Sequence, residues 1–171
     1  MSKNILIAAA LLGAAACSTT TPVVLVDADP RETRLSNLRQ LIDGGENAEA
    51  YWSADGAWIT FQSTREGRTC DQQYVMRADG SDLKRISDGR GKTTCGWFFP
   101  GGDRLLFGST TAHDATCPTR PDPSAGYVWP LDRYDIYTAN RDGSDVQRLT
   151  NFDVYTAEAI KIGRASCRER V

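Results

Sequence analysis

A phrase of fifteen residues occurs twice in this chain, and an internal repeat constrains the architecture more than any other sequence feature. Residues 73–87 return 63 positions later as residues 136–150, and both copies contain Asp-Gly-Ser-Asp with an arginine three residues further on. Residues 51–64 align in the same way with residues 97–110, which lie 46 positions later. Both pairs occur in the same order, so the chain contains two copies of one structural unit.

Apolar residues within each unit alternate at a period of two, which predicts β-strands. Ile59 and Phe61 lie on one face of the first copy, and Val75 lies opposite Tyr74 and Met76. Asp-Gly or Gly-Gly pairs separate the runs, where glycine supplies the positive φ of a tight hairpin. The predicted strands are 48–53, 57–63, 72–77 and 82–86, then 94–99, 104–109, 133–139 and 145–150. Each unit is therefore predicted to be a four-stranded antiparallel meander.

The pattern aromatic-Ser-x-Asp-Gly-x-x-Ile-x-Phe-x-Ser in residues 52–63, followed by Tyr-x-Met-x-x-Asp-Gly-Ser from Tyr74, resembles the WD40-like repeat of TolB-like proteins. The resemblance implies an all-β, partial β-propeller taken from a six-bladed parent. Its two four-stranded antiparallel blades would occupy about residues 46–87 and 92–150 of a propeller region spanning 34–160. Residues 35–42 would be an N-terminal strand that closes the ring against the last blade.

The N-terminus has the form of a secretory signal, because Lys3 precedes an apolar run too short to span a bilayer. Residues 1–16 are the predicted signal peptide, and residues 17–33 are the predicted tether. The small residues before Cys17 resemble the lipobox of bacterial lipoproteins, which implies lipidation of Cys17 and delivery to the outer membrane. An ordinary cleaved signal with a chance cysteine is the alternative.

Residues 161–171 have no counterpart in the repeat, and the last ten match the translation of a sequencing adapter. We therefore expect a non-native tail and a natural chain that continues beyond Ile160. A basic tail of native origin is the alternative. The whole chain has 20 basic and 22 acidic residues, and without both ends the numbers are 15 and 21. An acidic, exported domain is not expected to bind nucleic acid.

The second unit contains an insertion of 17 residues, which places a proline-rich loop at residues 111–132. The apolar side chains of Tyr127, Trp129 and Leu131 are candidates for an interaction surface, together with His113, the single histidine. The alternative is that these aromatic residues fold back over the blade.

Three cysteines remain when Cys17 and the one in the tail are set aside. An oxidising compartment favours one disulfide and one leftover thiol. Cys95 with Cys117 is the predicted pair, because both belong to one blade, and Cys70 is the alternative partner. No Cys-x-x-Cys core is present, so no zinc or other metal site is predicted.

Glu49 and Glu158 both stand in Ala-Glu-Ala just before an innermost strand, at the position that Cys95 holds in the second unit. Inner strands line the central channel of a propeller, so these carboxylates could bind a cationic peptide or an ion. The alternative is that they accept hydrogen bonds from the neighbouring blade. No catalytic motif and no cofactor-binding loop is present, so no catalytic residue and no cofactor is predicted.

The sequence therefore predicts a periplasmic, lipid-anchored scaffold that binds other envelope proteins. The resemblance to TolB-like proteins implies the peptidoglycan-associated lipoprotein as a partner. The alternative is the propeller of a prolyl-oligopeptidase-like serine peptidase whose catalytic domain lies outside this chain, since such repeats look similar.

Overall fold

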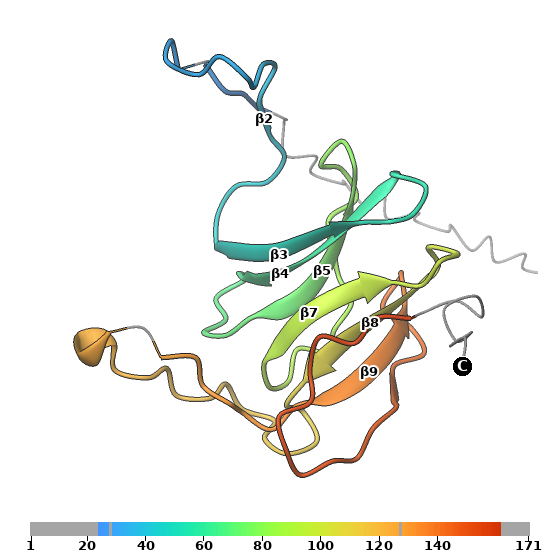
Figure 1. Ribbon diagram of the computed structural model, residues 1–171. Helices are drawn as coiled ribbons and strands as arrows, with labels where there is room; N and C mark the ends of the chain where they lie inside the picture. The colour runs from blue at the N-terminus through green and yellow to red at the C-terminus, as the bar shows by residue number, and fades with distance from the viewer. Residues whose placement is uncertain (1–23, 28, 127, 162–171) are drawn as a thin grey trace, which may run out of the picture.

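The computed structural model describes residues 24–27, 29–126 and 128–161. Two four-stranded antiparallel sheets lie side by side, and a small two-stranded sheet precedes them (Figure 1). The first large sheet, blade 1, contains β3 (Glu46–Trp52), β4 (Trp58–Thr64), β5 (Gln72–Arg77) and β6 (Lys84–Arg85). The second, blade 2, contains β7 (Thr93–Phe98), β8 (Arg104–Ser109), β9 (Asp135–Asn140) and β10 (Gln147–Arg148).

Each blade is a meander in which sequential strands are neighbours, so the predicted antiparallel four-stranded units are confirmed. The outer strands β6 and β10 have only two residues each and are shorter than predicted. Asp82 and Asp145 explain the later starts, because their φ angles of 55° and 51° are left-handed and interrupt any extended segment there. Closure of the blades into a ring stays a prediction.

The same hydrogen bonds tie the third strand of each blade to its outer segment. In blade 1 the Ser87 hydroxyl donates to Gln72 Oε1 at 2.7 Å and accepts from the next backbone N–H of β5 at 3.1 Å. In blade 2 the Thr150 hydroxyl donates to Asp135 Oδ1 at 2.8 Å and accepts from the next backbone N–H of β9 at 2.9 Å. The sequence repeat is thus a repeat of buried polar contacts as well as of strands.

The hydrophobic core lies between the two blades. It consists of Val75, Ile86, Leu105, Phe107, Tyr137 and Ala139. Since side chains alternate along a strand, the neighbours of Val75 point to the opposite face of blade 1. That face carries a second cluster of Ile59, Phe61, Tyr74 and Met76. Leu41 and Ile42, from the segment that leads into β3, pack against this second cluster.

The segment predicted to close a ring has a different partner in the structure. β1 (Val24–Leu25) pairs with β2 (Arg39–Gln40), and both strands are exposed. Within the described residues, β2 is therefore bonded to β1 and not to a blade. A closing role for residues 35–42 is not tested by this pairing.

The predicted signal peptide of residues 1–16 and the lipidation site Cys17 lie outside the described residues, as do residues 162–171 of the predicted non-native tail. Among the residues that the structure describes, no helix combines the length and the apolar character needed to cross a membrane.

Candidate interaction surfaces

Residues 111–132 form an arm between β8 and β9 that extends away from both blades (Figure 1). A single turn of 3-10 helix, η1 (Pro123–Ala125), lies in the far part of the arm. Asp122 begins this turn, and its carboxylate accepts a hydrogen bond from the Ser124 N–H at 2.9 Å. Prolines fix φ along the arm and restrict its conformations.

The arm is fastened to blade 1 although it emerges from blade 2. A disulfide joins Cys117 in the arm to Cys70 in the loop between β4 and β5. The guanidinium of Arg120 donates two hydrogen bonds to the Glu46 carboxylate, at 2.8 and 3.2 Å. The arm therefore links the first strand of blade 1 to the middle of blade 2.

The predicted disulfide between Cys95 and Cys117 is wrong, because Cys117 pairs with Cys70 and Cys95 is a buried free thiol. Cys95 lies in an irregularity of β7, where the pairing with β8 shifts between Thr94 and Trp97. Its N–H donates to Gln62 Oε1 of blade 1 at 3.1 Å, which holds this position in the interface between the blades. The sulfur of Cys117 in the arm instead meets Cys70 in the loop between β4 and β5.

A cleft of about 440 Å³ lies between the arm and blade 1, and we call it the arm cleft. Its apolar lining consists of Pro118, Pro121, Pro123, Val128, Trp129 and Pro130. Its charged lining consists of Glu46, Asp71, Lys92, Arg120, Asp122 and Asp132. Small-ligand and peptide sites in proteins have this size and this mixture of an apolar wall with a few polar groups.

Two of the predicted surface residues are open to solvent. The exposed fraction is 43% for Trp129 and 72% for Leu131. Tyr127 lies outside the described residues. The exposure of Trp129 and Leu131 favours an interaction surface on the arm over the alternative in which the apolar side chains are packed away against the blade.

His113 does not belong to this exposed surface, and its assignment to it is wrong. Its side chain is only 13% exposed, and its Nε2 lies 2.7 Å from Oδ2 of the fully buried Asp135. A carboxylate can only accept, so the imidazole carries its hydrogen on Nε2. His113 holds the start of the arm against β9.

Asp135 has the contacts of a functional residue but was not among the candidates predicted from the sequence. Its carboxylate accepts from His113, from Arg148 Nε at 3.1 Å, from the Thr150 hydroxyl at 2.8 Å and from the Phe152 N–H at 3.0 Å. Burial alone would raise the pKa of Asp135, but these hydrogen bonds outweigh it and hold that pKa below its ordinary value. The sequence offered one signal for this residue, because the repeat aligns Asp135 with the neutral Gln72 of the first unit.

Glu49, Cys95 and Glu158 occupy equivalent positions and share one backbone geometry. Their φ angles are 52°, 47° and 62°, so all three are left-handed. They line one cavity of about 290 Å³ together with Tyr51, Trp97 and Ile160. The structure therefore brings the two predicted carboxylates together with Cys95, at the inner edge of the blades. Binding of a cationic peptide or an ion there stays a prediction.

One carboxylate of this cavity, that of Glu49, accepts a hydrogen bond from a side chain that also lines the cavity. The Tyr51 hydroxyl donates to Glu49, and this contact is the main reason why the pKa of Tyr51 is raised to about 12. The Tyr51 ring stacks on Trp97, with ring centroids 3.8 Å apart. Glu49 thus bonds a side chain of its own strand. Whether it also accepts hydrogen bonds from a neighbouring blade stays a prediction.

Cys95 is expected to react slowly with alkylating agents. Its side chain is 7% exposed, burial raises the pKa of its thiol, and the carboxylates of Glu49 and Glu158 raise that pKa further, whereas a hydrogen bond with Thr94 lowers it. At pH 8 we expect iodoacetamide to modify Cys95 at least about 10-fold more slowly than an unfolded cysteine. Peptide mapping by mass spectrometry, with the urea-unfolded chain as the reference, measures this. Equal rates in the two states would contradict the buried position.

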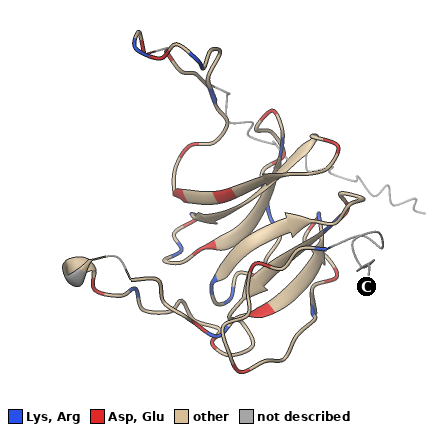
Figure 2. Cartoon of the chain, in the orientation of Figure 1, with Lys and Arg blue, Asp and Glu red and all other residues tan. Residues whose placement is uncertain are grey.

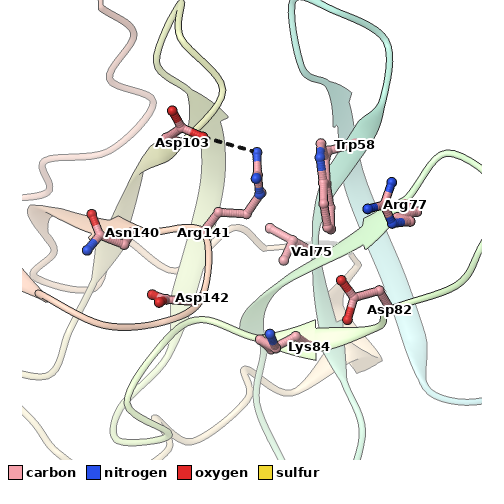
Figure 3. Close-up of a pocket in the computed structure, with 9 residues that line it drawn as sticks. All are labelled: Trp58, Val75, Arg77, Asp82, Lys84, Asp103, Asn140, Arg141 and Asp142. Carbon is pink, nitrogen blue, oxygen red and sulfur yellow. Dashed lines mark ion pairs between the residues drawn. The ribbon is translucent and has the colours of Figure 1, made fainter. Parts of the chain in front are cut away.

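A further cavity, of about 450 Å³, lies between the blades (Figure 3). The indole of Trp58 stands between two guanidinium groups, with Arg77 at 4.8 Å and Arg141 at 4.3 Å from the ring centroid. Arg141 reaches across from blade 2 and also donates to the Gly102 carbonyl at 2.9 Å. The basic residues of the cavity are Arg77, Lys84 and Arg141, and its acidic residues are Asp82, Asp103 and Asp142. Because these charges balance and Arg141 lies on the Trp58 ring of the other blade, the cavity is best explained as part of the contact between blades.

Charged residues are dispersed along the chain, with acidic and basic positions interspersed mainly in the loops and near strand ends (Figure 2). Within residues 24–161, residues 28 and 127 excepted, no three His, Cys, Asp or Glu side chains are arranged to hold a metal ion.

No protein-family model matches this chain. An uncharacterized protein of Agrobacterium fabrum is 37% identical over 84 residues, a match that covers 47% of this chain and 25% of that protein. The chain thus spans a quarter of the length of this curated relative.

Two solved structures are similar to this chain. A protein of Agrobacterium tumefaciens described as TolB has a TM-score of 0.52 and 27% identity, over 71% of this chain and 40% of that one. TolB from Acinetobacter baumannii has a TM-score of 0.47 and 21% identity, over 71% of this chain and 26% of that one. The two blades resemble part of TolB, and the chain is similar in structure to TolB over 71% of its length.

Proposed function

We propose that this chain belongs to an exported β-propeller protein that acts as a protein-interaction scaffold in the bacterial envelope. The observation that carries the proposal is the arm, an element added to a TolB-like blade that exposes Trp129 and Leu131. Large apolar side chains held on a rigid, exposed element are typical of the centre of a protein–protein contact. The similarity to TolB supports the scaffold class.

The disulfide supports the location. Disulfides persist in oxidising compartments such as the periplasm, and Cys70 and Cys117 are joined across two blades. Within the proposal, Cys17 carries the lipid anchor and the propeller region faces the periplasm at the outer membrane. The peptidoglycan-associated lipoprotein is the partner to test first.

Isothermal titration of the purified chain with the peptidoglycan-associated lipoprotein of the same bacterium tests the proposal. We expect one-to-one binding with a Kd of about 10 μM or tighter. The double change Trp129→Ala with Leu131→Ala should weaken binding at least about 10-fold, because it removes the apolar anchors.

Leu83→Ala is the matched control, since Leu83 is also an exposed leucine but lies outside the arm. Binding by this variant should equal that of the unchanged chain. No heat of binding at about 100 μM of either protein, a concentration at which a 10 μM complex would be mostly formed, would refute the partner. Equal loss of binding in the control and in the arm variant would refute the arm as the contact surface.

A further inference from the structure

Contacts within the chain itself set the shape of the arm cleft. The disulfide of Cys117 fixes the arm to blade 1, and the exposed pair of Arg120 with Glu46 adds a second contact beside the cleft. Prolines supply much of the apolar wall and offer no backbone N–H to a ligand. A fixed cleft loses little conformational entropy on binding, which favours a ligand that fills it with one side chain.

The charges of the cleft favour a cation. Its lining has four carboxylates, those of Glu46, Asp71, Asp122 and Asp132, but only two basic groups, those of Lys92 and Arg120. Arg120 is already neutralised by Glu46. Negative charge therefore remains in a cleft whose walls are mainly apolar, where electrostatic attraction is screened less than on an open surface.

The floor of the cleft shows how a cation is held. The Lys92 ammonium lies 4.0 Å from Asp132 Oδ2 and 5.6 Å from the centroid of the Trp129 ring. A carboxylate beside an indole is the chemistry that recognises a ligand cation. Asp132 Oδ2 itself is buried and accepts no hydrogen bond within the described residues, but the Asp132 side chain as a whole is 22% exposed and lines the cleft. Lys92 is too far from Asp132 Oδ2 for a hydrogen bond.

We propose that the arm cleft binds an arginine side chain of an extended peptide, an inference that rests on the interaction role proposed for the arm. The guanidinium donates to the exposed part of the Asp132 carboxylate and lies against the open part of the Trp129 ring, while apolar neighbours of the arginine contact the prolines. Arginine fits better than lysine, because a planar guanidinium can stack on an indole and bond a carboxylate at the same time.

The test uses three capped pentapeptides, Pro-Leu-Arg-Leu-Pro and its counterparts with citrulline or glutamate in place of arginine. Binding to the full chain is measured by isothermal titration. We expect the citrulline peptide to bind at least about 10-fold more weakly than the arginine peptide, since it has the same shape without the charge. The glutamate peptide should not bind. Equal affinity for arginine and citrulline, or no binding of the arginine peptide at about 1 mM, the weak end of measurable affinities, overturns the proposal.

Two variants of the chain locate the site. Asp132→Asn should weaken binding of the arginine peptide about 10-fold and leave the citrulline peptide unchanged. Lys92→Met should strengthen binding of the arginine peptide a few-fold, because it removes the cation that shares Asp132 and Trp129 with the ligand. Asp142→Asn, an exposed turn aspartate outside the cleft, is the control and should change neither affinity.

The peptide series needs only the unchanged chain, so it decides the proposal even where a variant fails to fold. It also separates this inference from the scaffold role. If the lipoprotein binds through Trp129 and Leu131 while arginine and citrulline peptides bind equally, the scaffold role is supported and the arginine site is refuted.

Discussion

Replacing Asp135 with alanine is expected to lower the free energy of unfolding by about 3–5 kcal/mol, because several hydrogen-bond donors lose their acceptor and each buried one costs about 1–3 kcal/mol. The Asp135 carboxylate is fully buried and accepts hydrogen bonds from the arm, from β10 and from the segment that follows it. Without it, Arg148 loses its counter-charge, and His113 and the Thr150 hydroxyl lose their acceptor. This one side chain therefore stabilises several segments of blade 2.

Urea denaturation followed by circular dichroism measures the effect. Gln72→Ala is the matched control, since Gln72 occupies the same position in blade 1 and accepts from Ser87, but carries no charge. We expect it to cost about 1–3 kcal/mol, the usual penalty for an unsatisfied neutral group. If both variants lose the same free energy, the charge of Asp135 is not what stabilises blade 2.

The same carboxylate predicts how stability changes with pH. The pKa of Asp135 is lowered in the folded chain, so the unfolded state binds its proton first as the pH falls. The stabilisation is complete above the unfolded pKa of about 3.9 and decreases as the pH falls through the folded value below it. Asp135→Asn should remove this part of the acid sensitivity. Parallel stability curves of the two chains between pH 5 and pH 2, the range in which carboxylates titrate, would contradict the assignment.

Replacing both Cys70 and Cys117 with serine is expected to lower the free energy of unfolding by about 2–4 kcal/mol, as for other disulfides that close long loops. The bond joins residues 47 positions apart and connects the two blades through the arm. Its loss raises the conformational entropy of the unfolded chain and also releases the arm from blade 1. Proteolysis should then cut the arm faster, because the covalent link to blade 1 is gone and the exposed Arg120–Glu46 pair holds the arm there only weakly.

Thermal unfolding and limited proteolysis of the oxidised chain, the double variant and Cys95→Ser compare the alternatives. Cys95→Ser keeps the disulfide and should leave the rate of cleavage in the arm unchanged. The pairing is wrong if Cys95→Ser accelerates arm cleavage as strongly as the double variant. Reduction of the unchanged chain with dithiothreitol should reproduce the double variant.

The strands and their order could be predicted because a β-meander is a local structure. Alternation of apolar residues defines the two faces of each strand, and Asp-Gly turns define the hairpins. Val75 faces blade 2 while its neighbours Tyr74 and Met76 face the other way, as the pattern indicates. The ends of the outer strands could not be predicted, since Asp82 and Asp145 adopt left-handed φ angles that composition does not reveal.

The candidate site was predicted less completely, because its residues come from different blades. The insertion and its exposed Trp129 and Leu131 are visible in the sequence as a break in the repeat. The choice of Cys70 over Cys95 as the partner of Cys117 depends on where the arm crosses blade 1. The pair of His113 with Asp135 depends on how the start of the arm meets β9, which no spacing in the sequence specifies.

The sequence by itself determined the repeat, the two antiparallel meanders and the place of the insertion, because these follow from side-chain alternation and turn residues within short segments. Only the tertiary structure decided which cysteines pair, which carboxylate is buried, and that Glu49, Cys95 and Glu158 share one cavity. Those outcomes depend on the packing of one blade against the other, which brings together residues that are far apart in the chain.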